Sequence, residues 1–116
     1  MLAKIYRLQK KKDIERVFKK GKGLKEGFLI LKTTKNNLES SRFGFVISQK
    51  VSKKATVRNK IKRRLREAIK ENLCLLKEGR DNLLIALPGL GNKNFLEIKK
   101  MISVLFKKAK IKKEKV

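Results

Sequence analysis

Apolar residues recur at intervals of three and four along the middle of the chain, from Ala55 to Lys77. Such spacing places them on one side of an α-helix. We therefore predict a long amphipathic helix that packs one face on a core. It should end by Gly79, because glycine accepts left-handed dihedral angles at a helix end. The apolar positions are Val57, Ile61, Leu65, Ala68, Ile69, Leu73 and Leu76.

Two shorter helices are predicted near the ends of the chain. Asp13 can cap the first of them and Gly21 can end it. Between these residues Ile14, Val17 and Phe18 repeat at helical spacing. The second is expected over about residues 94–110, with an apolar side formed by Phe95, Ile98, Ile102, Leu105, Phe106 and Ala109.

Three short segments have the pattern of β-strands. The first and third are apolar runs, as in buried strands. The second alternates, and we expect Phe43, Phe45 and Ile47 on its core side. Turn-forming residues separate the segments from their neighbours. The three segments are residues 28–34, 42–48 and 82–87.

The predicted order is thus helix, two strands, helix, strand and helix. We find no repeat and no interdomain linker, so we predict one domain over residues 1–116. Its fold class is α+β, a sandwich with helices packed on a sheet. Residues 110–116 are expected to be a frayed tail.

Composition adds a strong positive charge. The chain has 34 Lys and Arg against 10 acidic residues and no His, a net charge of +24, while 41% of its residues are hydrophobic. A chain this apolar can fold, and a folded domain with this charge is expected to bind a polyanion. It shows no transmembrane run and no signal peptide, so we expect a cytoplasmic protein that does not contact a membrane.

The charge is most concentrated at the start of the long helix, where six of the thirteen residues 55–67 are Lys or Arg. Arg58, Lys62 and Arg66 would form a ridge along one margin of the apolar stripe. Like charges one turn apart destabilise a helix unless an anion is present, which favours a phosphate-binding site. The other polar positions, Asn59, Lys60, Arg63 and Arg64, are expected on the far face.

Two other interpretations of the basic helix are less compatible with the sequence. A merely solvated surface would not explain the excess of positive charge along the whole chain. A helix lying on an anionic membrane needs bulky apolar residues that are free to insert, whereas these are used in a core.

Side chains suited to hydrolytic or metal chemistry are sparse. Because the acidic residues are scattered, we predict no catalytic residue and no metal site, so any reacting groups belong to a partner. Glu67 and Glu71 could hold a metal, but their basic neighbours favour ordinary salt bridges. Gly21 and Gly23 lack the spacing of a phosphate-binding loop. The single cysteine, Cys74, is expected to pack in the long helix.

Residues 57–67, Val-Arg-Asn-Lys-Ile-Lys-Arg-Arg-Leu-Arg-Glu, resemble the Arg-Asn-Arg motif of the bacterial ribonuclease P protein component. Residues 13–21 resemble the first helix of that family, and residues 42–48, followed by Lys50 and Val51, resemble its central strand. The likeness extends over nearly the whole chain in the same order. It implies a four-stranded sheet with three helices, in the order α-β-β-β-α-β-α. The extra strand would lie near residues 22–25.

The resemblance further implies that the long helix joins two parallel strands in a left-handed crossover, whereas general rules favour a right-handed one. The implied function is that of a protein subunit of ribonuclease P. It would bind the catalytic RNA subunit and the 5′ leader of precursor tRNA, and assist Mg²⁺-dependent removal of the leader. The Mg²⁺ would be held mainly by RNA, and no protein partner is implied.

Two sets of residues follow from this resemblance. One would bind the RNA subunit, and the other would line a cleft that holds the single-stranded leader. The RNA-binding set is Lys50, Arg58, Asn59, Lys60, Lys62, Arg63 and Arg66. The cleft set is Ile14, Phe18, Leu29, Leu31 and Val46.

This chain departs from the family at some of these positions. Lys60 replaces the second Arg of the motif, which keeps the charge but loses the planar guanidinium. Ile14 stands where a Phe is usual and Leu31 where an aromatic residue is common, so the cleft offers few rings for stacking.

The main alternative function is that of a ribosomal or other structural RNA-binding protein. A protein-only nuclease would need a carboxylate cluster that the sequence does not show.

Overall fold

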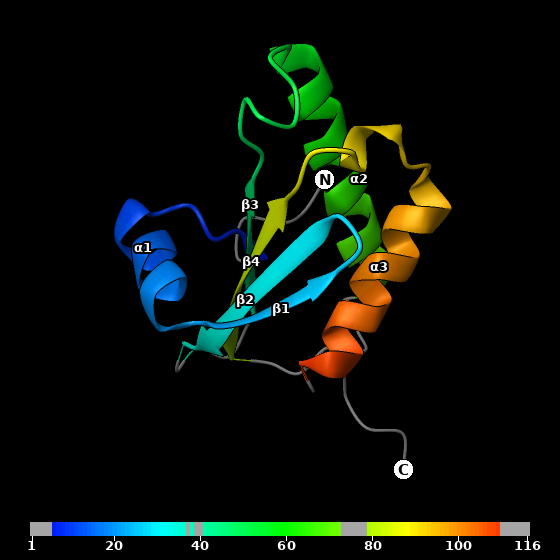
Figure 1. Cartoon of the computed structure of the whole chain (residues 1–116). Helices are drawn as coiled ribbons and strands as arrows, with labels where there is room; N and C mark the ends of the chain where they lie inside the picture. Colours follow the sequence, from blue (N-terminus) through cyan, green and yellow to red (C-terminus); the bar gives the residue numbers. More distant parts are fainter. Residues whose placement is uncertain (1–5, 37, 39–40, 73–78, 110–116) are drawn as a thin grey trace.

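The structure is a computed structural model that describes residues 6–36, 38, 41–72 and 79–109. The last turns predicted for the long helix, with Cys74, and the predicted frayed tail lie outside the described residues. Within them, three α-helices and four strands follow one another in the expected order (Figure 1). They are α1 (Lys11–Lys20), β1 (Lys22–Glu26), β2 (Leu29–Lys35), β3 (Arg42–Val46), α2 (Ala55–Asn72), β4 (Arg80–Ala86), the short 3-10 helix η3 (Leu90–Asn92) and α3 (Phe95–Lys108).

The four strands form one mixed sheet in the order β1-β2-β4-β3. β2 pairs antiparallel with β1 and β4, whereas β3 and β4 are parallel. Since α2 connects these two parallel strands, the predicted α+β fold and its crossover are confirmed. The left-handed sense of the crossover stays a prediction from the resemblance.

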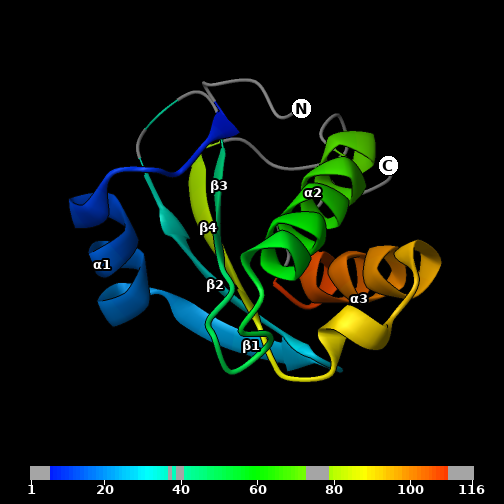
Figure 2. The same cartoon turned by 90° about the horizontal axis from the view of Figure 1, so that it is seen from above.

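Helices cover both faces of the sheet. Figure 2 shows α1 on one side and α2 with α3 on the other. Alternate strand residues therefore enter two separate apolar clusters. Between the sheet and α1 lie Leu8, Val17 and Leu83, with Ile14, Val46 and Ile85 packed against them. Between the sheet and the other two helices lie Leu29, Leu31, Phe43, Ile61, Leu65, Ala68, Ile69, Leu84, Ala86, Leu90, Ile98, Ile102, Leu105 and Phe106.

The first helix begins earlier than predicted. Its N-cap is Lys10, which makes no side-chain capping bond, and Asp13 lies inside the first turn. The Asp13 carboxylate instead accepts a hydrogen bond from Arg42 Nη1 at 3.3 Å, so it is turned toward β3. The helix does end before Gly21, where a Cβ would lie 2.3 Å from the Val17 carbonyl oxygen.

The C-terminal helix is capped by its own sequence. The Asn94 side chain accepts a hydrogen bond from the Glu97 amide at 2.9 Å, and the Glu97 carboxylate accepts one from the Asn94 amide at 3.3 Å. This capping box satisfies two amides that a helix start leaves unpaired. It fixes the beginning of α3, whose buried side packs on the sheet and on α2.

Candidate RNA interface

The first basic ridge of α2 consists of Arg58, Lys62 and Arg66, as predicted. All three are half-buried, which places them at the margin of the apolar stripe and not on the outer face. The Arg66 guanidinium lies 5.9 Å from the centre of the Phe45 ring. Lys62 and Arg66 also line a hollow of about 320 Å³ against β3 and the N-terminal segment. Arg7 from that segment lines the same hollow.

Arg58 organises the loop that leads into the helix. Its Nη1 donates to the carbonyl oxygen of Ser52 at 2.9 Å and to that of Lys53 at 3.0 Å. The guanidinium thus fixes the chain just before α2. The strand that precedes this loop, β3, ends at Val46, two residues earlier than predicted. Lys50 lies in this same loop and is exposed.

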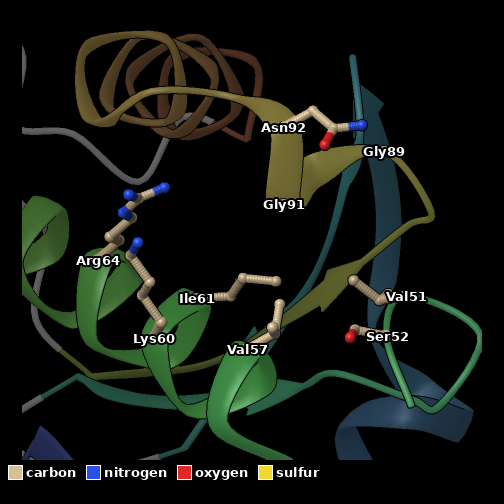
Figure 3. A pocket seen from close by; sticks show the side chains of 9 residues that line it. All are labelled: Val51, Ser52, Val57, Lys60, Ile61, Arg64, Gly89, Gly91 and Asn92. Carbon is tan, nitrogen blue, oxygen red and sulfur yellow. The ribbon is translucent and has the colours of Figure 1, made fainter. Parts of the chain in front are cut away.

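The prediction for Arg64 was wrong. Arg64 does not lie on the far face of α2 but at the second margin of the apolar stripe, opposite the first ridge. Arg64 is half-buried, and its Nη1 donates to the Lys93 carbonyl oxygen at 3.1 Å, next to η3. Lys60 and Arg64 line a pocket together (Figure 3). The other three residues of the predicted far-face set, Asn59, Lys60 and Arg63, are exposed.

The α1 side of the sheet carries partly exposed apolar residues. Ile14 and Val46 are half-buried there, whereas Phe18 is 46% exposed. The Lys32 ammonium lies 4.3 Å from the centre of the Phe18 ring and also donates to the Phe18 carbonyl oxygen at 2.9 Å. Phe18 is therefore not a core residue, and its ring is held at the surface by a cation.

Two residues assigned to the leader cleft lie on the wrong side of the sheet. Leu29 and Leu31 are fully buried in the core beneath α2 and α3, so neither can line an open surface next to α1. Strand residues alternate between faces, and the neighbours Ile30 and Lys32 point toward α1 instead. Neither residue was predicted from the sequence. Ile30 pairs with Ile85, which packs in the α1-side cluster, so the pairing of β2 with β4 identifies the residues of β2 that face α1.

A buried carboxylate joins α1 to the sheet. Asp81 in β4 is fully buried and accepts hydrogen bonds from Arg42 Nε and Nη2, both at 2.8 Å. It also accepts one from Asn36 Nδ2 at 2.9 Å, and it pairs with Arg16 of α1. Burial raises the pKa of Asp81, but the hydrogen bonds from Arg42 and Asn36 and the nearby positive charges outweigh it and hold that pKa below its ordinary value.

Candidate metal ligands are not clustered in the part of the chain that the structure describes. Among them, no three His, Cys, Asp or Glu side chains come together as metal ligands. The side chain of Glu71 lies outside what the structure describes, so the suggested pair with Glu67 is not observed. Of the helices in the described ranges, none combines the length and the apolar character needed to cross a membrane.

The sequence matches a known protein family along almost its entire length. The family model described as Ribonuclease P matches residues 2–110. A ribonuclease P protein component from Syntrophomonas wolfei is 37% identical over 109 residues, which cover 94% of this chain and 91% of the relative. The chain belongs to the ribonuclease P protein family. A second relative of that name, from Synechocystis, is 38% identical over 112 residues, which cover 95% of this chain and 90% of the relative.

Solved structures of ribonuclease P proteins have the same fold. The RNase P protein of Staphylococcus aureus superimposes with a TM-score of 0.85 at 29% identity, covering 93% of this chain and 98% of that one. The RNase P protein of Thermotoga maritima superimposes with a TM-score of 0.80 at 31% identity, covering 88% of this chain and 96% of that one. This chain is therefore a protein subunit of the endoribonuclease ribonuclease P, and its family implies RNA binding and tRNA processing. The comparisons thus support the ribonuclease P subunit and not the alternative of a ribosomal or other structural RNA-binding protein.

Proposed function

We propose that the chain binds the ribonuclease P RNA through α2 and the loop before it. The observation that carries this proposal is the density of cations on the solvent side of that helix. Arg58, Lys62 and Arg66 follow one margin, Arg63 is exposed on the outer face beside the neutral Asn59, and Lys60 and Lys50 are exposed close by in the sequence. Each cation that contacts a phosphate releases counterions from the RNA, which favours binding.

The 5′ leader of precursor tRNA is proposed to lie on the other side of the sheet, against α1. Phe18 offers an exposed ring there, and Ile14 and Val46 provide half-buried apolar surface beside it. Ile30 and Lys32 take the place of the two buried leucines in this surface. An exposed ring can stack any base, and Lys32 can reach the phosphate that follows it.

Mg²⁺ is proposed to act within the RNA and its substrate. Among the described residues no three His, Cys, Asp or Glu side chains come together as metal ligands, and no step of the reaction is assigned to this chain. Its part would be electrostatic: a net charge of +24 offsets repulsion between two polyanions and brings them together. The cytoplasmic location and the single domain over residues 1–116 belong to the same proposal, and no protein partner is included.

The proposal is tested by replacing Arg58, Lys62 and Arg66 together with Ala. We expect much weaker binding to the ribonuclease P RNA, because the first ridge is removed. The dependence of log K on log salt should also become shallower, by about 0.7–0.9 for each phosphate that the variant no longer neutralises. Titrations of the labelled RNA at several salt concentrations give both quantities.

The control replaces Lys107 and Lys108, two exposed lysines in the last turn of α3. It removes charge of the same sign from a different surface. Equal losses of affinity per removed charge in the two variants would mean that binding depends on charge alone and not on α2. Melting temperatures are needed for both, since Arg58 also holds the Ser52 and Lys53 carbonyls.

A further inference from the structure

A second feature of α2 is a pocket on the side away from the first ridge. It has a volume of about 390 Å³ and lies where α2, the loop before it and η3 meet (Figure 3). Small-molecule sites in proteins span about 300–1,000 Å³, so the space suits a ligand of nucleotide size. The pocket is lined by Val51, Ser52, Val57, Lys60, Ile61, Arg64, Gly89, Gly91 and Asn92.

Apolar and charged groups occupy different parts of this pocket. Val51, Val57 and Ile61 provide apolar surface, and the glycines of the η3 segment face them without side chains (Figure 3). Lys60 and Arg64 extend from successive turns of α2 at one end. A flat apolar ring would fit between the valines and the glycine backbone, with an attached anion at the cationic end.

The η3 wall is held in a fixed shape. Amides of Leu90, Asn92 and Lys93 donate to carbonyl oxygens three residues earlier, at 3.2, 3.1 and 3.0 Å. Arg64 ties this wall to α2 through its bond to the Lys93 carbonyl oxygen. A ligand would therefore meet a pocket that is already formed, which lowers the entropy lost on binding.

We propose that this pocket binds one unpaired nucleotide of the ribonuclease P RNA. Its base would lie between the valines and the glycine backbone, and its phosphate would contact Lys60 and Arg64. The Asn92 amide lies across the pocket from these cations and offers both a donor and an acceptor to the edge of a base (Figure 3).

This inference rests on the proposed function, since it needs α2 to face the RNA subunit. The RNA subunit is favoured over precursor tRNA because the pocket belongs to the α2 side of the sheet. The ring of Phe18, where the leader is proposed to bind, belongs to the α1 side.

Gly91 offers a direct test, because its backbone does not need glycine. Its φ angle lies outside the left-handed region, and an added Cβ would sit 3.6 Å from the Ile61 Cδ1, an ordinary contact. Gly91→Ala should therefore keep the pocket nearly intact and serve as the matched control. Gly91→Leu would fill the space that the base needs.

The experiment uses the full-length protein reconstituted with ribonuclease P RNA, and measures affinity at several salt concentrations. Gly91→Leu should weaken binding about ten-fold or more, because the base loses its apolar contacts and its phosphate is displaced from the cations. Its salt slope should become shallower by no more than the value for the one phosphate that the pocket holds, because both cations remain in the protein. Lys60→Ala with Arg64→Ala should also weaken binding and make the slope shallower. Gly91→Ala should stay within about two-fold of wild type in affinity.

Chemical probing of the bound RNA identifies the nucleotide. With wild-type protein, one unpaired position should be protected from base methylation or 2′-hydroxyl acylation, and Gly91→Leu should restore its reactivity. Asn92→Ala is a second variant, at an exposed position, and should also restore reactivity at that base. It provides the test of the pocket if Gly91→Leu lowers the melting temperature.

Unchanged affinity and unchanged probing with Gly91→Leu and Asn92→Ala would overturn the proposal. Restored reactivity in precursor tRNA, with none in the RNA subunit, would overturn the assignment to that subunit. If the Arg58, Lys62 and Arg66 variant loses affinity while both pocket variants bind normally, the α2 interface stands and the pocket fails. If that triple variant also binds normally, the proposed function itself is wrong.

Discussion

Asp81 shows how one residue can fix the geometry of the α1 side. It is fully buried in β4, yet its carboxylate is bound by Arg42 of β3, by Arg16 of α1 and by Asn36 after β2. A lone buried carboxylate would be very costly, and several charge-assisted hydrogen bonds offset that cost. The position of α1 over the sheet, and with it that of Phe18, thus depends on an acid that in the sequence is only one of several scattered carboxylates.

Replacement of Asp81 by Asn should destabilise the fold by about 3 kcal/mol, because two arginines lose the charge that compensates them. The side chains have nearly the same shape, so the loss reports charge and not packing. Urea unfolding at neutral pH measures the change. Asp13→Asn is the control: the Asp13 carboxylate pairs with Arg42 at 3.3 Å, its side chain is 26% exposed, and the replacement should cost less than about 1 kcal/mol.

The effect of Asp81 should also depend on pH. Its pKa is lowered in the folded protein, so its stabilising contribution is fully present above the unfolded-state pKa of about 3.9. The contribution is lost as the pH falls through the lowered folded-state value. The stability difference between wild type and Asp81→Asn should therefore be constant near neutral pH and shrink below about pH 4. A difference that stays constant down to about pH 2 would contradict the buried, ionised state of Asp81.

Phe18 is the residue whose function is easiest to isolate. Because its ring is 46% exposed, Phe18→Ala should change stability little. It should weaken binding of precursor tRNA with a leader of several nucleotides by about 1–3 kcal/mol, the value of one base stacked on an aromatic ring. Binding of mature tRNA without a leader should hardly change. The measured quantity is the ratio of the two affinities for the reconstituted complex.

Two further variants control for this result. Ile14→Phe adds a ring on the same helix and should raise the ratio of precursor to mature affinity. Lys32→Met removes the ammonium that lies over the Phe18 ring while keeping a long apolar side chain, and should lower that ratio by less than Phe18→Ala does. A Phe18→Ala protein with a lower melting temperature and an unchanged ratio would show that the leader binds elsewhere.

At the scale of elements, the helices and strands were largely predictable and the faces of the strands were not. The spacing of Ile61, Leu65 and Ile69 identified α2 and its buried side. All three residues are buried, which confirms this prediction. For β2 a shift of one residue moves every side chain to the opposite face. Leu29 and Ile30 are equally apolar, so the sequence of that strand alone could not decide which of them faces α1.

The start of α3 offers a test of local stability. Asn94→Ala removes the acceptor for the Glu97 amide and should cost about 1 kcal/mol, because a helix-start amide loses its partner. Asn94→Asp keeps a capping oxygen and should be close to wild type. The melting temperatures of the two variants give the comparison. RNA affinity should be the same in both, since α3 carries none of the proposed RNA contacts.

At the scale of the whole molecule, the sequence predicted the kind of partner but not the shape of the surface. A net charge of +24 required a polyanion, and the density of charge in α2 indicated where it would bind. The second margin of α2 was assigned wrongly because Arg64 is directed by Lys93, which is 29 residues away in the chain. The meeting of η3 with α2 is likewise an interaction between distant segments, and helical periodicity carries no information about it.

The charge of the whole molecule leads to the last prediction, which concerns the reaction. The protein alone should cleave no precursor tRNA, because its described residues bring no carboxylate cluster together that could hold a catalytic metal. Added to the ribonuclease P RNA, it should lower the Mg²⁺ concentration needed for half-maximal cleavage, since its +24 charge replaces part of the cation screening between two polyanions. Cleavage at the mature 5′ end is measured across a Mg²⁺ titration with each component omitted in turn. The Arg58, Lys62 and Arg66 variant should need more Mg²⁺ than the Lys107 and Lys108 control. Cleavage by protein that persists after nuclease treatment to remove RNA would place catalytic groups in this chain and overturn the assignment.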